Sequence, residues 1–144
     1  MTGGPLVDEA TSFGARVARH LRGDVVVWLT TVSPSGTPTP SVVWFLWDGD
    51  REVLMYSRQT SRVANIARNP RVSLNFPSDG VGGDVVVISG EARADPDAPR
   101  ADEVPGYLAK YGGRIGGGLD LTPAAFASRY HLAIRITLQR LRGH

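Results

Sequence analysis

Short links between strand-like segments constrain the fold of this chain more than any other feature of its sequence. Residues 24–32, 41–47 and 52–57 are rich in β-branched and aromatic side chains, and the turn-forming sequences Ser-Pro-Ser-Gly and Asp-Gly-Asp lie between them. Parallel strands need crossover connections of a dozen or more residues. The first three predicted strands therefore form an antiparallel meander.

Three further strand-like segments lie at residues 71–76, 84–93 and 130–138, and the helix signals around them are short. These signals predict helices over residues 7–21, from a Ser61 cap to Asn69-Pro70, over residues 104–111, and from the Thr122-Pro123 cap to about Arg129. The glycine-rich residues 112–118 are predicted to form a loop. Six strands with small helices predict a mainly β fold, an antiparallel barrel or sandwich, and disfavour a doubly wound sheet.

Length and composition indicate one domain spanning residues 1–144, because 42% hydrophobic content in 144 residues is enough for one continuous core. No segment approaches the roughly 18 consecutive apolar residues of a membrane-spanning helix, and the first residues lack the pattern of a targeting signal. We therefore expect a soluble, cytoplasmic protein with no membrane partner. A net charge of +2 is too small for a general nucleic-acid-binding face, so no nucleic-acid partner is expected.

The sequence contains few side chains that could carry out catalysis or bind a metal. The chain has no cysteine, which excludes disulfides, thiolate metal sites and a cysteine nucleophile. His20, His131 and His144 lack metal-ligand spacing, and we interpret each as structural or exposed to solvent. No nucleophile with a partnered histidine and acid can be assembled, and no close carboxylate pair is evident. We predict no catalytic side chain and no metal. An enzyme with so little side-chain chemistry is one whose cofactor supplies the chemistry.

The segment that follows the third predicted strand favours an anion-binding site. Ser57, Thr60 and Ser61 supply hydroxyl groups, Arg58 and Arg62 supply guanidinium groups, and the start of a helix supplies free backbone N–H groups. In the alternative interpretation, Ser61 only caps the helix and both arginines are solvated. Residue spacing alone does not decide between the two.

Two tryptophans on one predicted strand, Trp44 and Trp47, have odd spacing and therefore face opposite sides of the sheet. One ring can lie in the core. The other lies either at a subunit interface or beside a planar cofactor. Both readings of the outward ring favour a partner chain.

The order of elements and several stretches resemble the pyridoxamine 5'-phosphate oxidase-like split barrels, and most closely their actinobacterial branch of deazaflavin (coenzyme F420)-dependent oxidoreductases. The stretches that carry the resemblance are residues 28–38, 42–45 and 56–72, with the closing segments 107–111 and 129–130. The resemblance implies a six-stranded antiparallel split β-barrel of the FMN-binding type with short flanking helices. It also implies a homodimer with two cofactors in grooves between the barrels.

In relatives of this kind the cofactor ring lies over the strands and its phosphate lies at a strand-to-helix loop. Carried onto this chain, the implied cofactor-binding residues are Thr39, Ser41, Val42, Trp44, Tyr56, Ser57, Arg58, Gln59, Thr60, Ser61 and Arg62. Many relatives have lysine where this chain has Arg62, and arginine keeps the charge but changes the geometry.

The function that the resemblance implies is hydride transfer between F420 and a small organic acceptor. Two alternatives remain at this stage. One is an oxidoreductase of the same fold that binds FMN. The other is a noncatalytic protein that binds the cofactor or a tetrapyrrole.

Overall fold

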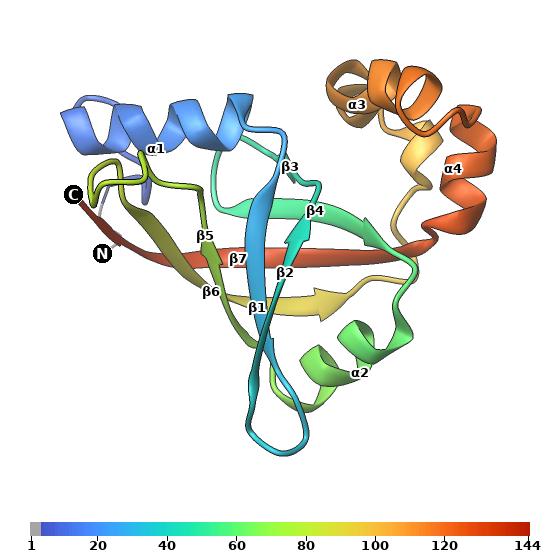
Figure 1. The fold of residues 1–144 in the computed structure, drawn as a ribbon, viewed down its shortest axis with the longest axis horizontal. Helices are drawn as coiled ribbons and strands as arrows, with labels where there is room; N and C mark the ends of the chain where they lie inside the picture. Colours follow the sequence, from blue (N-terminus) through green and yellow to red (C-terminus); the bar gives the residue numbers. More distant parts are fainter. Residues whose placement is uncertain (1–3) are drawn as a thin grey trace.

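A computed structural model describes residues 4–144, in which seven strands form one antiparallel sheet with α-helices around it (Figure 1). The strands are β1 (Val27–Val32), β2 (Pro38–Val43), β3 (Leu46–Trp47), β4 (Glu52–Ser57), β5 (Arg71–Asn75), β6 (Val86–Ala94) and β7 (Leu132–Gly143). The helices are α1 (Ser12–Gly23), α2 (Thr60–Arg68), the 3-10 turn η1 (Ala101–Glu103), α3 (Pro105–Gly117) and α4 (Pro123–Arg129). The mainly β class predicted from the sequence is confirmed.

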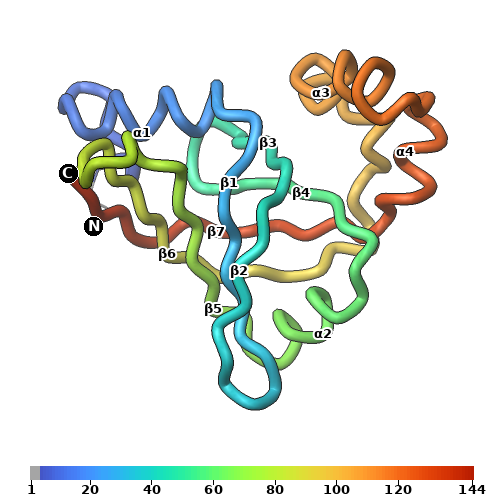
Figure 2. Tube along the Cα trace, in the orientation of Figure 1, coloured from blue at the N-terminus to red at the C-terminus, as the bar shows by residue number. Residues whose placement is uncertain are grey.

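The sheet curls into a partly open barrel in the strand order β2-β1-β5-β6-β7-β4-β3. In Figures 1 and 2 the β1–β2 hairpin and β5 cross in front of β4, β6 and β7. Helix α1 lies over one end of the barrel, and α3 and α4 extend beyond the other end. The inward faces enclose an apolar core whose fully buried side chains include Leu29, Phe45 and Ile134.

Strand β4 is buried on both faces, which is unusual for an antiparallel sheet. Val53 and Met55 point into the barrel core, whereas Leu54 and Tyr56 pack against α3 and α4 on the other face. Side chains alternate along a strand, so Ser57 lies on the same face as Met55, and Tyr56 lies on the same face as Leu54. Tyr56 and Ser57, at the end of β4, therefore point to opposite faces of the strand.

The prediction of six strands and of an initial meander is wrong, because the segment 41–47 forms two strands instead of one. β2 pairs with β1 at one edge of the sheet, and β3 pairs with β4 at the opposite edge. Between them, the Phe45 N–H donates to the Tyr111 hydroxyl at 2.9 Å, and Lys110 Nζ donates to the Phe45 carbonyl at 3.1 Å. Side chains of α3 therefore replace the ladder partners that a continuous strand would need.

Three helix predictions also need correction. α1 begins at Ser12, because the Thr11 hydroxyl accepts from the Gly14 N–H at 2.9 Å. Ser61 does not cap α2: the N-cap is Gln59, two residues earlier, it makes no side-chain capping bond, and the helix begins at Thr60. The predicted loop 112–118 is mostly helical, since α3 continues to Gly117 and buries Tyr107, Tyr111 and Ile115 at helical spacing. The Thr122-Pro123 start of α4 is confirmed.

The opposite placement of the two tryptophans is confirmed. Trp47 belongs to the barrel core, and its indole N–H donates to the Asp50 carbonyl at 2.9 Å. Trp44 packs instead with the residues of α3 and α4. No helix in residues 4–144 combines the length and the apolar character needed to cross a membrane.

His20 joins α1 to the connection before β6. Its Nδ1 lies 2.7 Å from an Asp24 carboxylate oxygen, its Nε2 lies 2.9 Å from one of Asp84, and its ring stacks on Phe76. Arg16 also donates to Asp84, at 2.9 Å. A carboxylate only accepts hydrogen bonds, so the geometry requires that both nitrogens of His20 carry protons. The prediction of a structural role for His20 fits this arrangement.

We expect the free energy of unfolding to depend on the charge of His20. Burial by itself lowers the pKa of His20, but hydrogen bonds to Asp84 and Asp24 and their charges outweigh it and raise the pKa. The stabilisation is fully present below the ordinary histidine pKa of about 6.5 and is lost as pH rises through the raised value. Urea unfolding measured from pH 6 upwards should show this loss in the wild type and not in His20→Gln.

The difference between the two proteins is the quantity to compare, because Lys110 works in the opposite direction. Burial lowers the pKa of Lys110 to about 8, so this residue makes the folded protein more stable as the pH rises above that value. Lys110 is present in both proteins, and its contribution cancels. An equal pH dependence in both would contradict the role assigned to His20.

Candidate functional site

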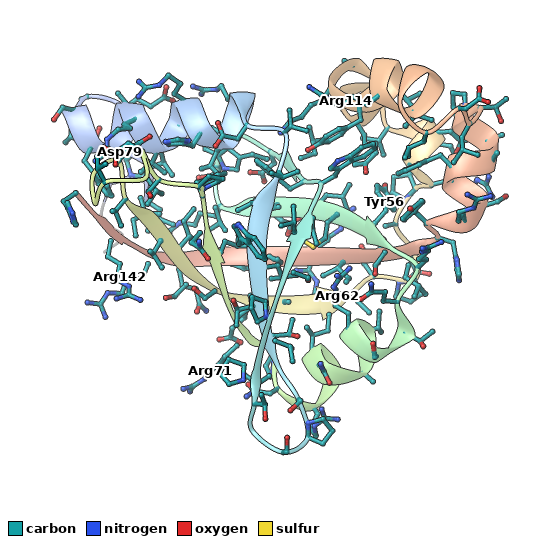
Figure 3. All side chains as sticks on the ribbon, viewed as in Figure 1. Tyr56, Arg62, Arg71, Asp79, Arg114 and Arg142 are labelled. Carbon is teal, nitrogen blue, oxygen red and sulfur yellow. The ribbon has the colours of Figure 1, made fainter. Side chains whose placement is uncertain are left out.

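A pocket of about 330 Å³ opens between the end of β4, the first turn of α2, the end of β2 and the helices α3 and α4. Figure 3 shows Tyr56 and Arg62 in this region, while Arg71, Asp79 and Arg142 lie elsewhere on the molecule. The pocket is lined by Val42, Val43, Trp44, Tyr56, Ser57, Arg58, Gln59, Arg62, Tyr107, Leu119, Phe126 and Tyr130. Its two ends differ: polar groups of the β4–α2 connection form one, and rings from α3 and α4 form the other.

Arg62 is the central group of the polar end. It lies in the first turn of α2, and its guanidinium donates to the Ser57 hydroxyl and to the Ser41 hydroxyl, each at 2.9 Å. The side chain is half buried, and burial lowers its pKa, although a guanidinium keeps its proton in proteins. Within residues 4–144 no carboxylate forms an ion pair with it.

Ser57 holds the polar end together. It is the last residue of β4, is only 2% exposed, and accepts from the Gln59 N–H at 3.0 Å as well as from Arg62. These bonds fix the turn that leads into α2. Because α2 starts here, the backbone N–H groups of its first turn are free of helical partners. A half-buried positive charge in the first turn of a helix is suited to an anion.

The other end of the pocket is a set of rings, here called the aromatic cluster: Trp44, Tyr56, Tyr107, Tyr111, Phe126 and Tyr130. Trp44 stacks on Tyr111 with ring centroids 4.5 Å apart and an angle of 5°, and Phe126 stacks on Tyr130 at 4.6 Å. Phe126 also stacks on Trp44 at 5.7 Å. All members of the cluster except the fully buried Tyr111 line the pocket and give it an apolar aromatic wall, as is common in ligand pockets.

Arg58 connects the two ends. Its guanidinium lies 5.7 Å from the centre of the Tyr130 ring, the side chain is exposed, and it lines the pocket. Like Arg62, it forms no ion pair in the described part of the chain. The pocket therefore carries two guanidinium groups whose charge is not neutralised by a carboxylate.

The residues predicted from the sequence fall into three groups. Those that line the pocket are Val42, Trp44, Tyr56, Ser57, Arg58, Gln59 and Arg62. Ser41 reaches it through its bond to Arg62. Thr39, Thr60 and Ser61 do not line it: Thr39 bonds Thr31 at 3.0 Å, and Thr60 and Ser61 are exposed on α2.

Sequence reasoning missed the part of the pocket that α3 and α4 supply. Tyr107 comes from α3, Leu119 from the connection after it, Phe126 from α4, and Tyr130 from the residue after α4. The spacing of Tyr107, Tyr111 and Ile115 was the available signal, because it marks a helix with a buried aromatic face. No group of three or more potential metal ligands occurs within the described residues.

A curled antiparallel sheet, with a pocket that joins a cationic strand-to-helix turn to an aromatic wall, is the architecture of a split-barrel protein. The family model described as pyridoxamine 5'-phosphate oxidase matches residues 13–144. The chain belongs to this family, and the resemblance inferred from the sequence is confirmed. A search of curated proteins gave no match.

Solved structures agree with this assignment. An F420 reductase is 25% identical, with a TM-score of 0.62 over 85% of this chain and 92% of that chain. A conserved hypothetical protein from Mycobacterium tuberculosis is 21% identical, with a TM-score of 0.64 over 99% and 88% of the two chains. An FAD-binding protein from Mesorhizobium loti is 15% identical, with a TM-score of 0.56 over 88% of each chain.

Proposed function

We propose that this protein is a coenzyme F420-dependent oxidoreductase that transfers a hydride between the cofactor and a small organic acceptor. The observation that carries the proposal is Arg62, a half-buried guanidinium beside an open pocket, held by two serine hydroxyls and paired with no carboxylate in residues 4–144. Such a charge is costly to bury without a counter-ion. A phosphate group of a bound cofactor would supply one.

The donor set fits the phosphate of a flavin or deazaflavin. Arg62 and Arg58 offer planar guanidinium groups, which can contact phosphate oxygens in pairs. The aromatic cluster lies at the other end of the same pocket, where a planar ring would lie. The bound cofactor would donate or accept the hydride.

The protein's own residues bind and orient. Arg62 fixes the phosphate end, and Val42 and Trp44 border the proposed ring position. The stacked rings of α3 and α4 exclude water from one side of the ring, which strengthens the remaining polar contacts and holds the reactants in register. No side chain is assigned to proton transfer, and solvent water would supply the proton.

F420 is preferred to FMN in this proposal for two reasons. The F420 reductase is similar over 85% of this chain, and two arginines that form no ion pair within residues 4–144 suit a longer anionic tail. FMN is the second candidate, and the similarity to an FAD-binding protein supports a flavin in this fold. Titrating the purified protein with F420 and with FMN, followed by turnover of the reduced cofactor with a panel of acceptors, tests the proposal. Tighter binding of FMN would overturn the choice of F420, and binding without turnover would support the carrier alternative.

The proposal includes a homodimer. Trp28 and Val42 are direct cross-strand neighbours on the outer face of β1 and β2, and they are 39% and 46% exposed. Val42 also lines the pocket, so a partner on this face would cover the pocket's open side. We expect sedimentation equilibrium to give twice the 15.5 kDa chain mass for the wild type and the single mass for Trp28→Glu. A monomeric wild type would contradict the dimer.

A further inference from the structure

Tyr107 differs from the other buried tyrosines of the aromatic cluster because its hydroxyl has no partner among the described residues. The Tyr56 hydroxyl donates to the Pro99 carbonyl at 2.7 Å, and the Tyr111 hydroxyl lies 2.7 Å from the Val25 carbonyl. No hydrogen bond involves the Tyr107 hydroxyl within residues 4–144, although the residue is only 1% exposed. Buried tyrosine hydroxyls are usually bonded, so this group needs an explanation.

The hydroxyl of Tyr107 opens into the pocket. Among the described residues no side-chain polar atom is both sealed from solvent and unpartnered, so this hydroxyl must reach open space. Tyr107 lines the pocket described above, and it lines neither the cavity beside Trp28 and Phe76 nor the one beside Pro99 and His131. The small exposed fraction of the residue is therefore directed at the proposed ligand.

The ring of Tyr107 is held in one orientation by its neighbours. Tyr56 meets it edge to face at 5.1 Å and 86°, Tyr111 lies at 5.0 Å, and Phe126 lies at 6.0 Å. Packing on several sides fixes the direction in which the hydroxyl points before any ligand arrives. A donor that is already oriented loses little entropy on binding.

The surroundings define which chemical group this donor would bind. Burial raises the pKa of Tyr107, so the hydroxyl keeps its proton and acts as a donor. Arg62 carries its positive charge at the polar end of the pocket, and an anionic group would bind there, while Arg58 lies between the two ends, over Tyr130. A neutral acceptor atom on a flat ring matches the aromatic end.

We propose that the Tyr107 hydroxyl donates a hydrogen bond to a carbonyl-type oxygen of a planar ring bound in the pocket. This inference deepens the proposed function, because the oxygen could belong to the cofactor ring or to the hydride acceptor. Tyr107 is thus a positioning residue that sets how the ring lies against the aromatic cluster. The phosphate contact at Arg62 fixes one end of the ligand, and Tyr107 fixes the other.

Two neutral probes test the hydrogen bond without a cofactor: 1-indanone, and indane, which has the same carbon frame without the oxygen. Ligand-observed NMR titration gives the dissociation constants for the wild type and for Tyr107→Phe. Loss of one neutral hydrogen bond should weaken the binding of 1-indanone about three- to tenfold and leave the affinity for indane unchanged. Equal affinity of 1-indanone for both proteins, or no binding of it to the wild type, would overturn the proposal.

The same variant then assigns the oxygen. Weaker binding of F420 or FMN alone to Tyr107→Phe places the oxygen on the cofactor ring. Unchanged cofactor affinity with a higher KM for a carbonyl-bearing acceptor places it on the acceptor, and no effect in either measurement overturns the proposal. A wild type that binds neither cofactor would overturn the proposed function alone, since the 1-indanone titration uses no cofactor.

Discussion

Replacing Arg62 with alanine should weaken binding of F420 about ten- to a hundredfold, because it removes a charge-assisted contact to phosphate from a partly buried site. Arg62 is held by the Ser57 and Ser41 hydroxyls at 2.9 Å each, so its fork is already oriented in the free protein. A preorganised charge contributes more to affinity than a mobile one. Following cofactor absorption or fluorescence during titration gives the dissociation constant for wild type and variant.

Arg68→Ala is the matched control for this change. Arg68 lies on the same helix and carries the same charge, but it is exposed and its side chain bonds only Asn65 at 2.9 Å. Its removal should change F420 affinity less than about twofold, because an exposed charge away from the ligand is screened by salt. Arg62→Lys should fall between wild type and Arg62→Ala, since an ammonium keeps the charge but loses the planar fork. Equal F420 affinities for the wild type and the three variants would show that Arg62 does not contact the cofactor.

The polar end of the pocket could be predicted from the sequence because its parts are adjacent in the chain. Ser57 and Arg62 are separated by five positions, and the end of a strand followed by a helix start places them together whatever the rest of the fold does. The same local reasoning placed Ser61 as the helix cap. It failed because the Ser57 hydroxyl, fixed at the strand end, organises the turn instead.

The aromatic end could not be predicted in the same way, because long-range contacts create it. Trp44 stacks on Tyr111, which is 67 positions away, only because β2 and β3 belong to opposite edges of the sheet. Local strand propensity is continuous across residues 41–47, and nothing local marks the break. The glycines of residues 112–118 likewise suggest a loop, but burial of Ile115 stabilises helix there.

Replacing Tyr111 with phenylalanine should lower the free energy of unfolding by about 2–4 kcal/mol, because two backbone groups lose their partner at once. The buried Phe45 N–H donates to this hydroxyl at 2.9 Å, and the hydroxyl lies 2.7 Å from the Val25 carbonyl. Burial raises the pKa of Tyr111 to about 12, so the hydroxyl is protonated and able to donate at neutral pH. Phenylalanine keeps the ring on which Trp44 stacks, and the measured loss belongs to the hydrogen bonds.

Tyr107→Phe is the control for Tyr111→Phe, because it makes the same chemical change one turn earlier on α3 in an equally buried ring. The Tyr107 hydroxyl has no partner in the described chain, so its removal should change the free energy of unfolding by less than about 0.5 kcal/mol. Urea unfolding curves of both variants against wild type measure the difference directly. If the two variants unfold at the same midpoint, the Tyr111 hydroxyl does not hold the crossover between β2 and β3. A large difference would show that one hydroxyl on α3 secures the place where the chain passes from one edge of the sheet to the other, and with it the aromatic wall of the pocket.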